Sequence, residues 1–70
     1  MTQHERIIEY MRLFGSITPM QAFQDIGCTK LSTRIGELER EGHRIGRERV
    51  KAKNRFGEQC SYMRYWLEED

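Results

Sequence analysis

The chain is most informative over residues 28–42, which read Cys28-Thr-Lys-Leu-Ser-Thr-Arg-Ile-Gly-Glu-Leu-Glu-Arg-Glu-Gly42. Leu31, Ile35 and Leu38 recur at the three- and four-residue spacing that aligns side chains along one stripe of a helix. The opposite face carries small polar and basic side chains. We therefore predict a helix over about residues 29–41, with its apolar stripe in a core and its polar face outside.

Basic residues crowd the chain directly after this helix. Between residues 44 and 55 they recur at nearly every second position, so several of them would project from one face of a strand. They are Arg44, Arg47, Arg49, Lys51, Lys53 and Arg55. The segment Arg55-Phe-Gly57 is typical of a turn, and Cys60–Leu67 is rich in strand-forming side chains. We therefore predict a basic two-stranded hairpin over about residues 44–67.

The two predicted strands differ in their patterning. In the first strand, Ile45 and Val50 lie at opposite parities, so we expect a bulge or a change of face within it. The second strand alternates regularly, and at least two of its three aromatic residues are expected in the core. Its two faces hold Met63, Tyr65 and Leu67, and Tyr62, Arg64 and Trp66.

A capping box marks the start of the first helix. The side chains of Thr2 and Glu5 are spaced to accept hydrogen bonds from each other's backbone N–H groups. Apolar side chains then follow at helical spacing, and Gly15 supplies the left-handed residue that commonly ends a helix. We place this helix at about residues 3–14.

The second helix begins with the same signal. Thr18 and Gln21 repeat the capping box, and Pro19 occupies the first turn, where its missing N–H costs nothing. We predict a helix over about residues 19–26, which is too short to be stable alone and must pack against its neighbours. Its apolar stripe consists of Met20, Phe23 and Ile26.

A glycine-centred turn joins the second and third helices. Gly27 leaves about three residues between them, with Cys28 or Thr29 as the expected cap of the third helix, and this length suits a helix-turn-helix. The expected order is therefore helix, helix, helix, strand, strand. We predict an α+β fold, a winged helix-turn-helix with a three-helix bundle followed by a two-stranded antiparallel β-hairpin wing, in a single domain over residues 1–70.

Length and composition restrict the class of function. A chain of 70 residues buries only about 60% of its unfolded surface, which leaves no room for a deep substrate pocket. No apolar run approaches the roughly 18 residues that span a bilayer. The first five residues lack the basic and apolar regions of a secretion signal. We therefore expect a cytoplasmic protein that binds neither a membrane nor a small-molecule substrate.

Residues with catalytic or metal-binding chemistry are scarce. Cys28 and Cys60 match no metal-binding spacing and are expected to be ordinary thiols. His4 and His43 have no partner at the spacing of metal ligands or of a catalytic nucleophile. A glycine-rich phosphate loop, paired carboxylates and a serine elbow are all missing from the sequence. The sequence therefore predicts that the protein is not an enzyme and needs neither a cofactor nor a metal.

Charge is unevenly distributed, although the net charge is only +1. Residues 1–41 carry five basic and six acidic side chains, whereas residues 42–67 carry seven basic and two acidic ones. The local charge of this second segment decides how the protein meets a polyanion. The acidic end, residues 68–70, is expected either to blunt the sheet edge or to remain disordered.

Two groups of residues are candidates for contact with duplex DNA. Short hydroxyl side chains on the third helix allow close approach to base edges, while Glu37 and Glu39 oppose contact farther along it. The expected helix contacts are Thr29, Lys30, Ser32, Thr33 and Arg34. The hairpin would meet phosphates along its length and a minor groove at its tip. The expected hairpin contacts are Arg47, Arg49, Lys51, Lys53, Asn54 and Arg55.

Each pattern also has a simpler interpretation. The helix face is compatible with plain solvation, and the basic run with solubility alone. The short turn before the helix and the charge imbalance after it favour DNA over both. Phe56 is expected either to prop the turn or to pack against a sugar. Stacking of single-stranded bases on Tyr62, Tyr65 and Trp66 is disfavoured, because the core needs these rings.

Several strings of the sequence are similar to a known family. They are Ser16-Ile-Thr-Pro-Met-Gln-Ala22, Ile26-Gly-Cys28, Leu31-Ser-Thr-Arg-Ile-Gly-Glu-Leu38 and Val50-Lys-Ala-Lys-Asn-Arg-Phe-Gly57. From about Thr2 to Leu67 the chain resembles small phage and prophage helix-turn-helix proteins, most specifically in Lys-Asn-Arg-Phe-Gly. The resemblance implies winged-helix DNA binding, with Thr29 to Arg34 as recognition residues and Lys51 to Phe56 as wing residues.

One departure from the more common winged repressors concerns the turn. Leu31 follows Gly27 more closely than in those proteins, which would rotate or slide the third helix. Two functions stay open at this point. The first is a phage-type transcription regulator or excisionase-like recombination accessory factor that binds double-stranded DNA, with possible self-association or a protein partner on it. The alternative is a protein-interaction module, such as a phage inhibitor of a host nucleoprotein complex.

Overall fold

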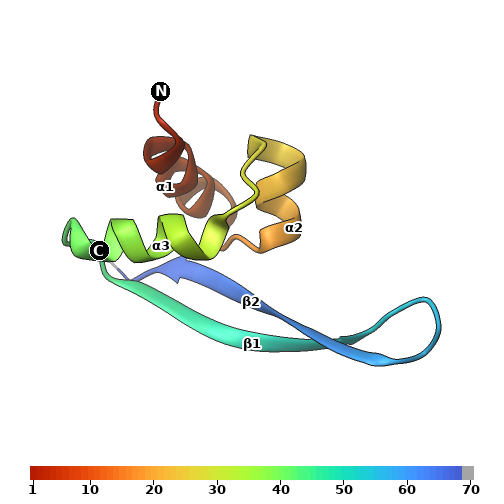
Figure 1. Cartoon of the computed structure of the whole chain (residues 1–70). Helices are drawn as coiled ribbons and strands as arrows, with labels where there is room; N and C mark the ends of the chain where they lie inside the picture. Colours follow the sequence, from red (N-terminus) through yellow and green to blue (C-terminus); the bar gives the residue numbers. More distant parts are fainter. Residues whose placement is uncertain (69–70) are drawn as a thin grey trace.

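The computed structural model describes residues 1–68, which form a layer of helices over an antiparallel hairpin (Figure 1). The elements are α1 (Gln3–Phe14), α2 (Pro19–Gln21), the π-helix η1 (Ala22–Ile26), α3 (Leu31–Arg40), β1 (Ile45–Lys53) and β2 (Gln59–Leu67). This order confirms the predicted α+β winged helix-turn-helix. Glu69 and Asp70, which belong to the predicted acidic end, lie outside the described residues.

The capping chemistry predicted for α1 is present. Thr2 Oγ1 accepts the Glu5 N–H at 3.1 Å, and Glu5 Oε1 accepts the Thr2 N–H at 3.0 Å. The hydrogen bond from the Thr2 backbone also lowers the pKa of Glu5, since it stabilises the carboxylate. Gly15, with φ of +87°, ends the helix in the left-handed conformation.

The second helix starts as predicted but does not continue as a regular α-helix. Thr18 and Gln21 form the capping box, and after Gln21 the chain widens into the π-helix η1. The predicted stripe is wrong in two of its three members, because Met20 is 64% exposed and Phe23 is 58% exposed. A wider turn moves side chains around the helix axis, so the small Ala22 becomes the buried residue instead.

Helix α3 begins two residues later than predicted. Its N-cap is Lys30, which makes no side-chain capping bond, so the prediction of Cys28 or Thr29 as the cap was wrong. Cys28 is 2% exposed and packs in the core. Its thiol is nearly apolar and gains more from burial than from capping a helix. The connecting turn therefore runs from Gly27, which has φ of +79°, to Lys30.

The hairpin has an unbroken register. Nine residue pairs run from Ile45 opposite Leu67 to Lys53 opposite Gln59, and Gly57 takes a positive φ of +77° in the turn. The expected bulge in the first strand was wrong. Val50 needs no place in the core, because it lies opposite Tyr62 on the outer face and the two side chains can pack across the strands.

Ile17 joins the hairpin to the helices. Its backbone exchanges two hydrogen bonds with Tyr65, of 2.8 and 2.9 Å, so β2 lies between this one-residue strand and β1. Ile17 and Tyr65 are both buried, whereas Trp66 is half-buried and Tyr62 is exposed. The core consists of Ile7, Ile8, Met11, Ile17, Ala22, Cys28, Leu31, Ile35, Leu38, Ile45 and Tyr65.

The hairpin extends well past the helical layer. Figure 1 shows β1 and β2 running beneath α3 and then continuing past one end of this helix to a tip that projects from the molecule. Nine residues of strand span about 30 Å, whereas the ten residues of α3 span about 15 Å. Within residues 1–68, no helix is both long and apolar enough to cross a membrane.

Candidate nucleic-acid interface

The two faces of the hairpin carry different side chains. Alternation along β1 places Arg47, Arg49, Lys51 and Lys53, here called the basic row, on the same face as Ile45. Ile45 is buried in the core, so this face is the one that turns toward the helices. The outer face holds the pairs Gly46–Trp66, Glu48–Arg64, Val50–Tyr62 and Ala52–Cys60. The predicted alternation therefore gathers four cations on one face of the hairpin, and the first of them, Arg47, meets α3.

The first two cations of the basic row are held by neighbouring side chains. Arg47 forms an ion pair with Glu39 of α3, and its guanidinium lies 5.6 Å from the centre of the Tyr65 ring. Arg49 Nη1 donates to Ser61 Oγ at 3.2 Å. The pair between Arg47 and Glu39 ties β1 to α3 and reduces the negative charge that Glu39 would present to DNA.

The cations farther along the hairpin have no side-chain partner within residues 1–68. Lys51, Lys53 and Arg55 are exposed, and none of them makes an ion pair or side-chain hydrogen bond with residues 1–68. On the outer face, by contrast, Arg64 pairs with Glu48 and lies 5.7 Å from the centre of the Trp66 ring. Within the hairpin, residues 45–67, the cations without such a partner therefore lie in its distal half.

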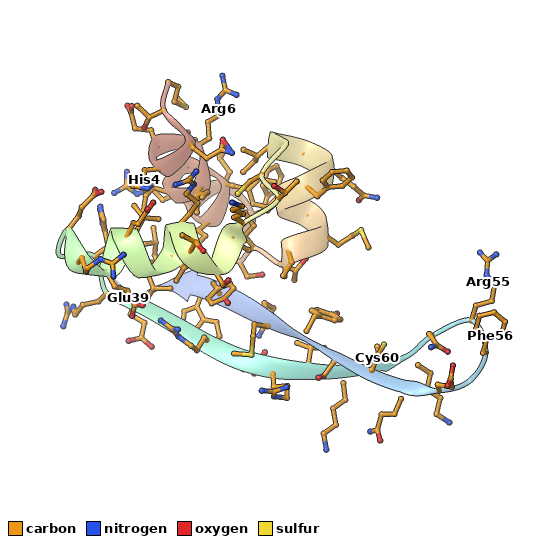
Figure 2. The ribbon with its side chains drawn as sticks, viewed as in Figure 1. His4, Arg6, Glu39, Arg55, Phe56 and Cys60 are labelled. Atoms are coloured by element: carbon orange, nitrogen blue, oxygen red, sulfur yellow. The ribbon has the colours of Figure 1, made fainter. Side chains whose placement is uncertain are left out.

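The tip is organised by Asn54. Its Oδ1 accepts the backbone N–H groups of Phe56 at 2.9 Å and Glu58 at 3.0 Å, and its Nδ2 donates to Glu58 Oε1 at 3.3 Å. Asn54 was predicted to contact DNA, but its side chain is engaged in shaping the turn. Arg55 and Phe56 lie at the outer end of the hairpin, away from the helices (Figure 2).

The outward side of α3 begins with the predicted hydroxyl residues. Thr29, Lys30, Ser32 and Thr33 are all exposed. With Leu31 and Ile35 buried, the helical step of about 100° per residue directs Thr33 opposite the core and Ser32 toward the side of Glu39, which pairs with the hairpin, while Thr29 lies in the turn before α3. The leading part of α3 thus presents small side chains to the outside of the molecule.

Arg34 lies on the other flank of α3, beside the start of α1. Its Nη1 donates to Glu37 Oε1 at 3.0 Å, and its Nε is buried without a hydrogen-bond partner among the described residues. Of the predicted helix contacts, Arg34 is the one that the structure places away from the hairpin. Its contact with DNA, like that of the other predicted site residues, stays a prediction.

His4 connects α1 to the same flank. Its Nε2 lies 2.8 Å from Glu37 Oε1, and its Nδ1 lies 2.9 Å from Glu41 Oε2. Hydrogen bonds from His4 and then from Arg34 lower the pKa of Glu37, because both stabilise the carboxylate. Among residues 1–68, these and the remaining titratable side chains form no cluster that could hold a metal ion.

Sequence reasoning missed the interactions that depend on the tertiary structure. The sequence pattern presents Glu39 only as an obstacle to DNA, whereas the structure pairs it with Arg47. His4 carries no recognisable motif because its two carboxylate partners lie more than thirty residues away in the chain. The exposure of Phe56, at 84%, also excludes the expectation that its ring props the turn.

Three helices that lead into a long antiparallel hairpin, with small residues on the third helix and cations on the hairpin, define a winged helix-turn-helix domain. A family model described as a winged helix-turn-helix domain matches residues 2–70, and the chain belongs to that family. The predicted winged-helix resemblance is therefore confirmed, and the fold is one that binds double-stranded DNA and is typically not enzymatic. No curated protein and no solved structure matches the chain.

Proposed function

We propose that the protein recognises a specific sequence in double-stranded DNA with α3 and holds the flanking backbone with its hairpin. The observation that carries this proposal is that Lys51 and Lys53 are exposed, make no ion pair with residues 1–68 and share one face of a hairpin that projects past α3 (Figure 1). A helix that offers small side chains to base edges beside a row of cations combines sequence reading with phosphate binding.

The leading part of α3 would enter the major groove. Thr29, Ser32 and Thr33 are short enough to let the helix backbone approach the bases, and Lys30 can reach a phosphate or a guanine edge. The major groove, about 12 Å wide, accommodates one α-helix. The hairpin would then follow the backbone toward the adjacent minor groove, with Arg55 at its far end.

The proposed biological role is regulation or assistance at DNA. A small transcription regulator and an excisionase-like recombination accessory factor of phage type both require a compact reader of short sites. A single winged domain reads about one half-site, so specificity would come from repeated sites or from self-association on DNA. Such a protein needs no cofactor.

Selection from random duplexes at moderate salt tests this function, followed by fluorescence anisotropy on the sequence recovered. Thr33→Ala should change the sequence preference, because it alters a side chain directed at base edges. Lys53→Ala and Arg55→Ala should weaken binding to every duplex and flatten its salt dependence. Failure of the wild-type chain to bind any duplex at low salt would contradict the proposal.

One observation favours a second candidate, a protein-interaction module. The exposed side chains of Met20 and Phe23 line a surface hollow together with Pro19, Cys28 and Leu31. Exposed apolar groups of this kind are common at protein-binding surfaces. Under this alternative, Phe23→Ala would abolish function in the cell, and the wild-type chain would not shift a mixed duplex at low salt.

A further inference from the structure

The exposed aromatic ring at the hairpin tip has no structural role within residues 1–68. Phe56 is 84% exposed, the largest value among the exposed large hydrophobic residues. It makes no aromatic pair with the described residues, whereas Phe14 on α1 packs against the Tyr10 ring at 4.7 Å. A ring kept in water at the end of a projecting arm points to a partner that buries it.

The backbone that carries Phe56 is held in one conformation. The Phe56 N–H donates to Asn54 Oδ1, the Gly57 N–H donates to the Asn54 carbonyl at 3.0 Å, and the Asn54 N–H donates to the Glu58 carbonyl at 2.9 Å. These bonds hold the backbone from which the Phe56 side chain projects before any partner arrives. Such preorganisation lowers the entropy cost of inserting the ring into a binding site.

The charges around the ring identify the partner as DNA. Arg55 precedes Phe56 and Lys53 lies two residues before Arg55, and both are free of ion pairs with residues 1–68. The one nearby acid, Glu58, is engaged by the Asn54 side chain on the inner side of the turn. Figure 2 shows Arg55 and Phe56 together at the end of the arm. An apolar ring beside two phosphate-binding cations suits a groove of the duplex.

The reach of the arm selects the groove. With α3 in the major groove, the neighbouring minor groove lies about half a helical turn away, or roughly 17 Å along the axis. The strands extend about 15 Å farther than α3 when the lengths of the two elements are compared. The turn of residues 54–58 carries Phe56 beyond the end of the strands and adds to this reach. The tip is therefore long enough to enter the minor groove while α3 stays in place.

We propose that Phe56 is a wedge that inserts at a base-pair step in the minor groove and bends the duplex. The preferred site is a flexible pyrimidine–purine step, which is the easiest to unstack. This inference rests on the proposed DNA binding and adds an activity to it, because a protein that bends its site acts on DNA architecture as well as on sequence.

The test measures the bend by energy transfer between dyes on the two ends of a duplex of about 30 base pairs, close to three helical turns. The duplex carries the selected sequence. The wild-type protein and Phe56→Leu, which keeps an apolar wedge, should both bend it by roughly 20–90°. Phe56→Ala should bind with roughly 5- to 150-fold lower affinity and lose most of the bend. The matched control Phe14→Ala, which removes another exposed ring, should bend the duplex as the wild type does.

The outcomes separate this inference from the function on which it rests. An unbent duplex in the wild-type complex, or an equal bend with Phe56→Ala, would overturn the wedge and leave DNA binding intact. Absence of any complex would overturn both. Because Phe56 is exposed, its replacement should leave the melting temperature unchanged, so misfolding cannot imitate a loss of bending.

Discussion

The base and the distal half of the hairpin both carry basic side chains at alternate positions of β1. They differ in whether these side chains have partners within the protein. In the base, residues 45–49 and 63–67, Arg47 is paired with Glu39 and Arg49 is bonded to Ser61. In the distal half, residues 50–62, Lys51, Lys53 and Arg55 have no such partners within residues 1–68. The base also contributes Ile45 and Tyr65 to the core, whereas the distal half contributes no core residue.

This difference shows how a small domain orients an arm that it cannot bury. The base is anchored by apolar contacts and by the backbone bonds between Ile17 and Tyr65. The ion pair with Glu39 adds a tether between β1 and α3. The distal half then projects its cations beyond α3, without side-chain partners among residues 1–68 that DNA phosphates would have to displace.

The largest expected effect is on the free energy of unfolding, which should fall far more when a tyrosine is removed from the base of the hairpin than from its distal half. Tyr65→Ala removes a side chain that is 4% exposed and should cost about 3–5 kcal/mol of unfolding free energy. A domain of this size has little more than that in total, so the variant should be largely unfolded. Tyr62→Ala, in the distal half and 42% exposed, should stay folded. Thermal unfolding followed by circular dichroism compares the two, and equal losses would show that the base is not the anchor.

The next largest effect concerns affinity. Replacing Lys51, Lys53 and Arg55 together by alanine should lower the slope of log K against log salt by about 0.9 for each phosphate that the protein no longer neutralises. Folding should be retained, since these side chains are exposed. Arg64→Ala is the matched control, because it removes a hairpin cation from the outer face. If the salt slope changes more with Arg64→Ala than with the triple variant, DNA binds the outer face of the hairpin, and the proposed interface is wrong.

A smaller effect measures the tether between β1 and α3. Arg47→Ala, Glu39→Ala and the double variant form a cycle whose coupling energy should be about 0.2–1 kcal/mol, because both side chains are partly exposed. Urea unfolding supplies the four free energies. A coupling energy of zero would mean that apolar contacts alone hold the base of the hairpin against the helices. The base and the distal half would then differ only in how deeply their residues are buried.

The smallest expected effect is a dependence of the folding stability on pH, which arises from Glu37 on the side of α3 that faces α1. The pKa of Glu37 is lowered in the folded state by His4 and Arg34. The resulting stability is present above the unfolded-state pKa of this carboxyl and is lost as the pH falls through the folded-state value. Glu37→Gln should therefore narrow the difference in melting temperature between neutral and acidic solutions. An unchanged difference would show that the carboxylate contributes nothing there.

Much of the fold was predictable because its signals are local. The capping boxes at Thr2 and Thr18, the apolar stripe of α3 and the glycine of the hairpin turn each follow from a few neighbouring residues. The errors arose where tertiary packing overrides local preference. Cys28 is drawn into the core instead of capping α3, and the π-helix η1 turns Phe23 outward.

The candidate site was predictable in composition but not in detail. Alternation along β1 was enough to group the basic row on one face. The sequence alone does not reveal that Arg47 has a partner on α3, that Arg34 bonds Glu37, or that Asn54 shapes the tip. These assignments depend on distances between side chains, which residue spacing does not contain.

The central claim is that α3 and the distal half of the hairpin contact the same duplex. Its most direct test is a titration of isotope-labelled protein with the selected duplex, followed by two-dimensional NMR of the backbone amides. We expect the largest shift changes in residues 29–33 and 51–57, with little change around Met20. Changes confined to the surface around Met20 and Phe23, with the hairpin amides unmoved, would contradict the account.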